Sequence, residues 1–285
     1  MGFEGFVLIA IAPGLFWLWL FVRLDRIRPA PRRLIALTFL WGMVSVVPAA
    51  IIETFAIGDE ALEVSASLNA VALAMFAVVG PVEELSKFTS VRLSVFRSLY
   101  FDEPMDGLVY SAAASLGFAS LENLIYVLNF GPEVMLARAP LSTLAHLVFG
   151  SLWGYGLAVY QRSGRKRHMP LLLALVGAAA LHASFNVAIF GGWPLISVVL
   201  VAVGAVWAYH RFLWGQRTSP FRYRRSLALA ACWRCGTLNR ATNRFCEHCG
   251  AKARHGAEEL VCGNCKLPNR HDALYCTRCG DRLLR

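Results

Sequence analysis

Seven apolar runs, each long enough to cross a lipid bilayer, occupy most of the first 215 residues. A spanning helix needs about 20 consecutive apolar residues, and backbone groups in lipid must be satisfied inside the segment itself. The runs cover residues 5–22, 34–57, 68–96, 107–129, 141–160, 170–190 and 193–213. We therefore expect residues 1–215 to form an all-α polytopic membrane helix bundle of about seven spans, in contact with the lipid bilayer.

The basic residues between the runs indicate how this bundle crosses the membrane. Arg and Lys gather after the first, third, fifth and seventh runs, whereas the other connections hold almost none. Basic loops face the cytoplasm. We therefore expect an integral membrane protein with its N-terminus outside and its C-terminal tail in the cytoplasm. The basic juxtamembrane linker, residues 216–227, suits anionic lipid headgroups.

All eight cysteines lie after residue 231, in two blocks that repeat with a period of 30 residues. In each block, two Cys-x2-Cys turns are separated by ten residues. The two sets are Cys232, Cys235, Cys246 and Cys249, and Cys262, Cys265, Cys276 and Cys279. Four thiolates at this spacing favour a tetrahedral structural zinc site. Disulfides are the alternative, but they need an oxidising compartment, and the tail is expected in the cytoplasm. Residues 228–285 are therefore predicted to be two small zinc ribbons with two structural Zn2+ ions.

The net charge of +10 could indicate a nucleic-acid partner, but its distribution argues against one. Part of the charge lies in the linker next to the membrane. A four-thiolate zinc site carries about two negative charges, so two sites offset most of the basic charge of the tail. We therefore expect the ribbons to bind a cytoplasmic protein partner or to stabilise the chain. Closed four-thiolate sites keep no open position for catalysis.

Seven polar side chains lie within about two turns of the middle of four consecutive runs. They are Glu83, Glu84 and Lys87 in the third run, Glu122 in the fourth, His146 in the fifth, and His182 and Asn186 in the sixth. A charge at the centre of a spanning helix costs roughly 2.5–3.5 kcal/mol on insertion scales, and such residues normally face a partner inside the bundle. We therefore expect these side chains to converge on one interior site.

The spacing of the charged residues in the third run gives their local geometry. Glu83 and Lys87 are four residues apart and share a helix face, so they can pair. Glu84 lies about 100° further round, so the two carboxylates are expected to diverge. Gly80 and Pro81 predict a kink just before them, because proline removes a backbone hydrogen bond.

Each polar feature by itself also has a structural explanation. Glu83 and Lys87 can form an intrahelical pair, and Glu122 can link two helices. His146 alone is more often a hydrogen-bonded interior histidine than a catalyst. Glu53, near the outer end of the second run, is expected at the membrane interface.

Four short motifs carry a resemblance to a known family. They are "EELSK", "GFASLEN" with Phe118 and Glu122, "LAHLVFG" with His146, and "HASFN" with His182 and Asn186. In this order on separate runs, they resemble the PrsW-type intramembrane proteases, relatives of the CAAX prenyl-protein endopeptidases and bacteriocin-processing enzymes. The resemblance covers residues 68–190. The CAAX branch usually has an Arg after its paired glutamates and a His where Glu122 stands, so the PrsW branch is favoured.

The resemblance implies an intramembrane endopeptidase in a bacterial plasma membrane that hydrolyses membrane-anchored proteins, in some cases anti-sigma factors. Glu83 or Glu84 would activate the water, with Lys87 holding the second carboxylate ionised. His182 or Asn186 would donate to the oxyanion. In the alternative, His146, His182 and a carboxylate would hold a catalytic zinc ion. The family is described both ways. The histidines lack the spacing that clamps zinc from one helix, which favours a metal-free glutamic mechanism.

Two other function classes remain open from the sequence. One is a non-catalytic membrane scaffold or receptor that acts through its zinc ribbons, which lie outside the resemblance. The other is an ion or proton carrier that uses the buried Glu and His residues. No inverted repeat of the spans is visible, which counts against a transporter.

Overall fold

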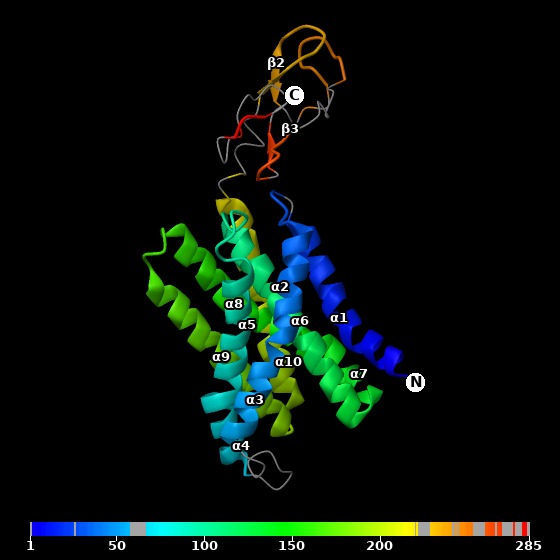
Figure 1. Ribbon diagram of the computed structural model, residues 1–285, viewed down its shortest axis with the longest axis vertical. Helices are drawn as coiled ribbons and strands as arrows, with labels where there is room; N and C mark the ends of the chain where they lie inside the picture. Colours follow the sequence, from blue (N-terminus) through cyan, green and yellow to red (C-terminus); the bar gives the residue numbers. More distant parts are fainter. Residues whose placement is uncertain are drawn as a thin grey trace. The chain divides into compact units, whose positions relative to one another are not determined.

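The computed structural model describes residues 2–25, 27–57, 67–219, 221, 229–240, 243, 245–252, 260–265, 267–269, 276 and 281–283. The chain forms two compact units, Met1–Ser219 and Pro220–Arg285. The first unit is helical (Figure 1). Its main helices are α1 (Phe3–Leu24), α2 (Arg32–Val44), α3 (Val46–Ile57), α4 (Leu68–Ala74), α5 (Gly80–Ser94), α6 (Pro104–Phe130), α8 (Thr143–Arg162), α9 (His168–Phe190) and α10 (Pro194–Thr218).

Short irregular turns connect some of these helices. They are the π-helical turn η2 (Met75–Val79), the 3-10 turn η3 (Pro132–Val134), α7 (Met135–Ala137) and the π-helical turn η4 (Arg138–Ser142). The second span is divided between α2 and α3 at Ser45, three residues before Pro48. Proline cannot donate a backbone hydrogen bond and clashes with the preceding turn, so an interruption is expected there.

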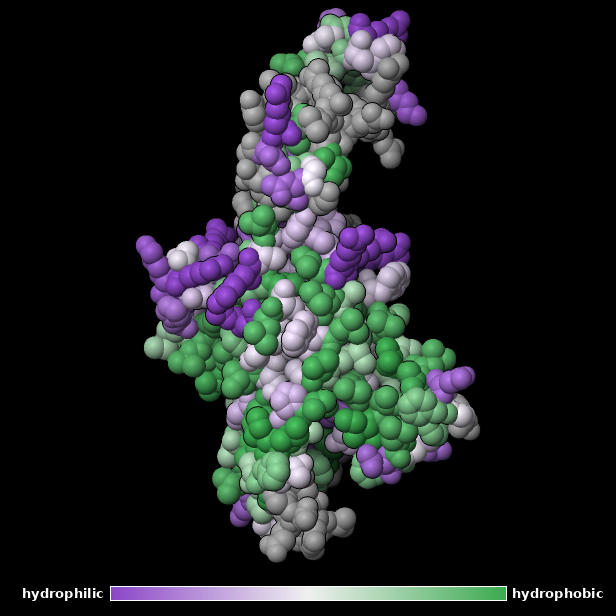
Figure 2. Space-filling model, viewed as in Figure 1, coloured by the Kyte–Doolittle hydropathy of each residue, from purple (hydrophilic) through white to green (hydrophobic). Residues whose placement is uncertain are grey.

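The described residues contain seven helical segments that are long and apolar enough to cross a membrane. They cover residues 3–24, 32–57, 68–94, 104–130, 132–162, 168–190 and 194–218. The predicted helical membrane bundle is therefore confirmed. The fifth segment begins nine residues earlier than the sequence indicated, because η3, α7 and η4 continue the helical path. Figure 2 shows apolar residues over most of the visible face of this unit.

Helix α6 forms the centre of the bundle and packs against α1, α2 and α8. Every residue from Pro104 to Ser120 is buried. Small residues along α6 let its neighbours approach closely, as is usual in membrane bundles. A Cβ atom added to Gly117 would lie only 2.0 Å from the carbonyl oxygen of Phe39 on α2. The core is therefore built around the helix that carries Glu122.

Side-chain bonds join the basic connections at one end of the bundle. Arg28 forms an ion pair with Asp102. The amide of Gln161 donates to the carbonyl oxygen of Phe101 at 2.9 Å, and that of Gln216 donates to the carbonyl oxygen of Leu24 at 2.6 Å. The connections after α1, α5, α8 and α10 therefore lie at the same end, as their shared basic charge indicated.

Two carboxyl groups are buried at this end, outside the spanning helices that hold the polar cluster. Asp25 accepts a hydrogen bond from the backbone N–H of Ala30, and Glu103 accepts one from Ser219. Burial raises the pKa of Asp25 from 3.8 to about 6 and the pKa of Glu103, the residue before α6, from 4.5 to about 7.

The second unit contains two small antiparallel strand pairs. Strand β1 (Leu229–Ala231) pairs with β2 (Leu238–Arg240), with Leu229 opposite Arg240. Strand β3 (Leu260–Val261) pairs with β4 (Pro268–Asn269), with Leu260 opposite Asn269. Each pair surrounds one Cys-x2-Cys turn. The linker residues 222–228 and Cys279 lie outside the described residues.

Candidate active site

The paired glutamates follow an irregular turn in the third span. The π-helical turn η2 ends at Val79, and Gly80 and Pro81 begin α5. The expected kink therefore takes the form of a π-helical turn, a feature that is frequent at functional sites. A Cβ atom on Gly80 would lie 2.5 Å from the carbonyl oxygen of Ala179. Glycine at this position thus lets α9, which carries His182, approach the carboxylates.

The ammonium group of Lys87 lies at the centre of the cluster. Its Nζ is 2.9 Å from Glu83 Oε2, 2.9 Å from Glu84 Oε1 and 2.9 Å from His146 Nδ1. The lysine is fully buried. The ring centroid of Phe118 lies 4.2 Å from Nζ, within reach of a cation–π contact. The two carboxylates therefore converge on one ammonium group and do not diverge as expected, because Lys87 is three residues from Glu84 and four from Glu83.

Glu84 is held by three donors from three helices. Its Oε1 receives hydrogen bonds from Lys87 and His182, and its Oε2 accepts one from the indole N–H of Trp153 at 2.9 Å. The side chain is 1% exposed. A carboxylate with three donors and no access to solvent is well suited to orient its neighbours. Trp153 is a contact that the sequence analysis missed, since an aromatic residue inside a span carries no polar signal.

His182 on α9 presents one ring nitrogen to each carboxylate. Its Nδ1 lies 2.9 Å from Glu84 Oε1, and its Nε2 lies 3.8 Å from Glu83 Oε2. An ionised carboxylate can only accept, so Nδ1 carries the hydrogen. This arrangement fixes the ring orientation and leaves Nε2 directed toward Glu83. The same logic orients the imidazole of a catalytic His–Asp pair.

His146 on α8 connects Lys87 to Glu122 on α6. An ammonium group has only donors, so His146 Nδ1 must accept from Lys87. The other nitrogen, Nε2, then carries the hydrogen and lies 2.8 Å from Glu122 Oε2. The contacts therefore assign one neutral tautomer to His146 and engage both of its ring nitrogens.

Glu122 has a second partner that the sequence did not reveal. Arg138 Nη2 lies 2.9 Å from Glu122 Oε2, and Arg138 Nε donates to Asn123 Oδ1 at 2.8 Å. The guanidinium also lies 3.7 Å from the ring centroid of Tyr126. Asn123 in turn donates to Thr143 Oγ1 at 3.0 Å. Arg138 is in η4, in a connection that the apolar runs excluded from the spans, so only its tertiary position reveals the contact.

Two further residues complete the surroundings. Asn186, one turn beyond His182, is half-buried and has no hydrogen-bond partner in the described part of the chain. Glu53 was expected at the membrane interface, but the negative charges of Glu83 and Glu122 act on its carboxylate, and one of its buried oxygens has no hydrogen-bond partner among the described residues. Glu53 lies two turns beyond Val46 on the α3 face that packs against Phe118. It therefore faces the cluster.

Glu83, His146 and His182 each offer one donor atom, and these atoms lie within 4.8 Å of one another. Two histidines and a glutamate form an acceptable catalytic zinc set. In this arrangement, however, Lys87 is bonded to both Glu83 and His146, and neither nitrogen of His146 has a free lone pair. The three donors do not fit a metal ion while Lys87 holds this position.

In the tail, the described cysteines gather as the spacing predicted. The Sγ atoms of Cys232 and Cys249 are 3.6 Å apart, as are those of Cys235 and Cys246. Those of Cys265 and Cys276 are 3.4 Å apart. Sulfur atoms around a tetrahedral zinc ion, with bonds of about 2.3 Å, lie roughly 3.8 Å apart, whereas a disulfide is about 2.05 Å long. The three distances are therefore those of metal ligands and are too long for disulfides between these pairs.

An asparagine supports a cysteine in each block. Asn239 donates to Cys246 Sγ at 3.3 Å, and Asn269 donates to Cys276 Sγ at 3.6 Å. These pairs repeat with the same 30-residue period as the cysteines. Donors to the sulfur atoms orient metal ligands, so both blocks fit zinc ribbons. The sequence already contained this signal: Asn239 in "LNR" and Asn269 in "LPNR" repeat with the cysteines.

Comparisons with known proteins give two family matches. Residues 30–211 match the family described as PrsW family intramembrane metalloprotease, and residues 232–280 match the double zinc ribbon family. A protein named Protease PrsW from Bacillus subtilis (strain 168) is 33% identical over 181 residues, which cover 62% of this chain and 78% of that protein. A protein of the same name from Geobacillus kaustophilus (strain HTA426) is 32% identical over 176 residues, which cover 62% of this chain and 76% of that protein. No solved structure matches the chain.

Proposed function

The chain belongs to the PrsW family of intramembrane proteases, and from this premise we propose that the buried cluster on α5, α6, α8 and α9 is its catalytic centre. The contacts of Lys87 with Glu83, Glu84 and His146 carry the proposal. Family membership makes the chain an intramembrane protease, in preference to a scaffold or a carrier. Its substrate is then a protein, and its spans require a bilayer. The scaffold and ion-carrier alternatives have no comparable support.

The two glutamates take different roles in this proposal. Glu83 is the general base, because among the described residues Lys87 alone donates a side-chain hydrogen bond to it, and its carboxylate faces the second ring nitrogen of His182 at 3.8 Å. Glu84 is a positioning residue, because Lys87, Trp153 and His182 already occupy its oxygens. Its three donors hold it as an acceptor and leave it little capacity to take a proton from water.

In the proposed reaction, Glu83 takes up one proton and later releases it. Glu83 takes a proton from water while the water oxygen bonds to the peptide carbonyl carbon. The carbonyl oxygen becomes an oxyanion, for which the unpartnered amide of Asn186 is the candidate donor. When the carbon–nitrogen bond breaks, Glu83 returns its proton to the leaving amine. His182, oriented by Glu84, places its Nε2 beside this transfer, and Glu122 keeps His146 in the tautomer that accepts from Lys87.

We propose that this hydrolysis needs no metal ion, although the family description includes the word metalloprotease. The ammonium group of Lys87 supplies the positive charge next to Glu83 and uses the lone pair of His146 that a metal would need. If a metal ion displaced Lys87, then Glu83, His146 and His182 would hold it, and it would supply Lewis-acid chemistry. The choice is therefore testable with a chelator.

The decisive experiment uses the purified full chain in lipid nanodiscs with a membrane-anchored peptide substrate. Glu83→Gln should lower kcat by about 10²–10⁴-fold, because it removes the base and keeps the shape. A second protein ends at residue 219 and so lacks the tail but is otherwise wild type. Its rate of cleavage should be the same with and without the chelator 1,10-phenanthroline. Wild-type activity in Glu83→Gln would exclude its role as base, and chelator-sensitive cleavage by the tail-less bundle would support the metal mechanism.

For the tail, we propose two structural Zn2+ ions bound by the cysteine sets, with Cys279 completing the second. The substrate class is a membrane-anchored protein, including regulators of the anti-sigma-factor type, and the ribbons dock a cytoplasmic protein partner or regulate access. This arrangement assumes a bacterial plasma membrane with the N-terminus outside. The proposal rests on the family, the basic connections at one end of the bundle and the paired thiols.

A further inference from the structure

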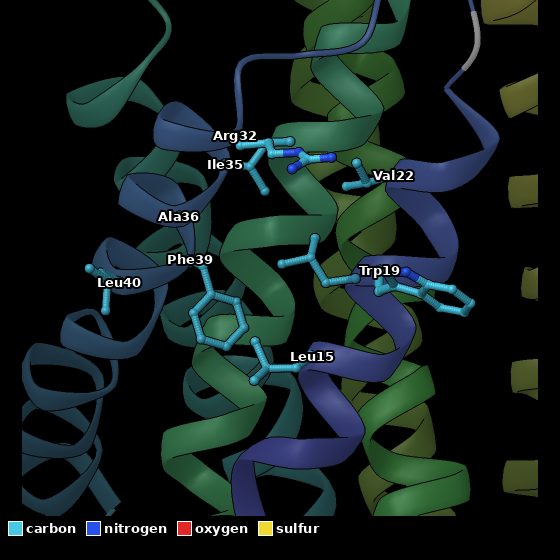
Figure 3. A pocket seen from close by; sticks show the side chains of 9 residues that line it. Leu15, Trp19, Val22, Arg32, Ile35, Ala36, Phe39 and Leu40 are labelled. Carbon is cyan, nitrogen blue, oxygen red and sulfur yellow. The ribbon is translucent and has the colours of Figure 1, made fainter.

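A groove with a volume of about 390 Å³ lies between α1 and α2. Leu15, Trp19 and Val22 from α1, and Phe39 and Leu40 from α2, form most of its walls (Figure 3). In a bilayer, lipid acyl chains have access to this groove, because Leu15 is 50%, Trp19 53% and Leu40 57% exposed. It belongs to neither the proposed catalytic centre nor the ribbons.

The sequence explains why the groove exists. On α1, Leu15, Trp19 and Val22 recur at helical spacing and share one face, as do Arg32, Ala36 and Leu40 on α2. Both helices pack against α6, which separates their apolar faces. The space between α1 and α2 therefore stays open toward the membrane.

One end of the groove is positively charged. Figure 3 shows the guanidinium of Arg32 extending from α2 across this end toward Val22 on α1. The guanidinium groups of Arg32 and its neighbour Arg33 have no ion-pair or hydrogen-bond partner among the residues that the structure describes. Arg32 also begins α2, where backbone N–H groups and the helix dipole favour an anion.

We propose that the groove binds an acyl chain of an anionic phospholipid, with the phosphate of the lipid on Arg32. The occupant must be apolar along the groove and negatively charged at the Arg32 end, and an anionic phospholipid has both properties. Apolar contact alone selects little inside a bilayer, because lipid tails are as apolar as leucine. The charge of Arg32 therefore provides the selectivity.

A substrate helix fits this groove less well than a lipid. At the end of the bundle where the basic connections gather, a spanning helix of the same membrane carries its own Lys and Arg residues. These would face Arg32 with the same sign of charge. An anionic headgroup has the opposite sign, and Arg32 can bind its phosphate with two parallel hydrogen bonds.

The test compares phospholipid retention by the full chain, reconstituted in vesicles of equal dioleoyl-phosphatidylglycerol and dioleoyl-phosphatidylcholine. After extraction in mild detergent, native mass spectrometry counts the lipids held by each chain. The wild type should retain phosphatidylglycerol with about a fivefold preference, the factor expected from one arginine near the headgroup. Arg32→Gln should abolish this preference, and Ala36→Trp should displace either lipid by filling the groove.

Arg33→Gln is the matched control, because it removes the same charge at the same depth from a residue that does not line the groove. It should keep the wild-type preference. Equal retention of the two lipids by the wild type, or equal losses in Arg32→Gln and Arg33→Gln, would overturn the proposal. Unchanged lipid retention in Ala36→Trp, together with impaired cleavage of a membrane-anchored substrate, would instead indicate a substrate helix and also overturn it. Thermal unfolding of each variant establishes that it is folded.

Discussion

Replacing Arg138 by Met tests whether the proposed catalytic centre depends on a residue from outside the four motifs of the spans. The substitution keeps an unbranched side chain but removes the guanidinium from Glu122 and Asn123. In the structure, Arg138 lies 2.9 Å from Glu122 and 2.8 Å from Asn123, and its side chain is 11% exposed. Among the described residues, Glu122 would then keep His146 as its remaining ion-pair partner.

The expected magnitude follows from this burial. Removing one partner of a buried ion pair costs about 3–5 kcal/mol, because the other charge is left uncompensated. Since Glu122 is 17% exposed, solvent reduces the loss, and we expect about 2–3 kcal/mol in stability. A displaced Glu122 no longer orients His146, so kcat should fall by about 10- to 100-fold, a typical cost of misplacing a supporting group. KM should change little.

The assay measures kcat and KM for a membrane-anchored peptide in nanodiscs, with thermal unfolding of the same samples. Arg138→Lys keeps the charge but loses the guanidinium that reaches both Glu122 and Asn123, so it should recover part of kcat. Arg92→Met is the control, because Arg92 lies on α5 and has no hydrogen bond or ion pair among the described residues; its guanidinium lies 4.3 Å from the centroid of the Phe96 ring. It should retain wild-type kcat.

A double-mutant cycle tests most directly whether Arg138 acts through Glu122. Glu122→Gln removes the charge that Arg138 compensates, so the two substitutions should couple by about 0.5–3 kcal/mol. If the effects on kcat were additive within about 0.5 kcal/mol, Arg138 would not act through Glu122. Wild-type kcat in a folded Arg138→Met variant would also refute the argument.

Three other predictions follow from the site, the tail and the buried carboxyl groups. Trp153→Phe removes one donor from buried Glu84 and should lower stability by about 1–3 kcal/mol, measured by thermal unfolding; an unchanged midpoint would contradict the positioning role of that bond. Deleting residues 228–285 should leave cleavage of a short model substrate intact; loss of cleavage in a folded bundle would show that the ribbons take part in catalysis. Chelation of the full chain should release about two zinc ions and unfold only the tail. Because burial raises the pKa of Asp25 from 3.8 to about 6 and that of Glu103 from 4.5 to about 7, the folded state holds protons that the unfolded state releases. The stability that these two groups contribute should thus be greatest below about pH 4 and be lost as the pH rises to about 7, by about 3 kcal/mol for each group. Asp25→Asn should remove its share of this loss in pH-resolved unfolding curves.

The sequence was sufficient for the features that depend on one segment at a time. Apolar length identifies a spanning helix wherever it lies in the bundle, so the seven segments were predictable. The cysteine spacing likewise encodes the shape of each Cys-x2-Cys turn. The polar residues in the four spans were predicted to meet, since leaving each of them in lipid is costly. Glu83, Glu84, Lys87, Glu122, His146 and His182 do meet, whereas Asn186 lies beside them without a hydrogen-bond partner among the described residues.

The tertiary structure alone decided how these groups divide their contacts. Helical spacing suggested that Glu83 and Glu84 diverge, but Lys87 reaches both, and Trp153 and His182 bind only Glu84 closely. Arg138 lies before the apolar run of the fifth span, and no periodicity indicates that η4 turns it toward Glu122. The relative rotation and approach of packed helices set these contacts. That packing depends on many small contacts, such as Gly80 against α9, which a single segment does not encode.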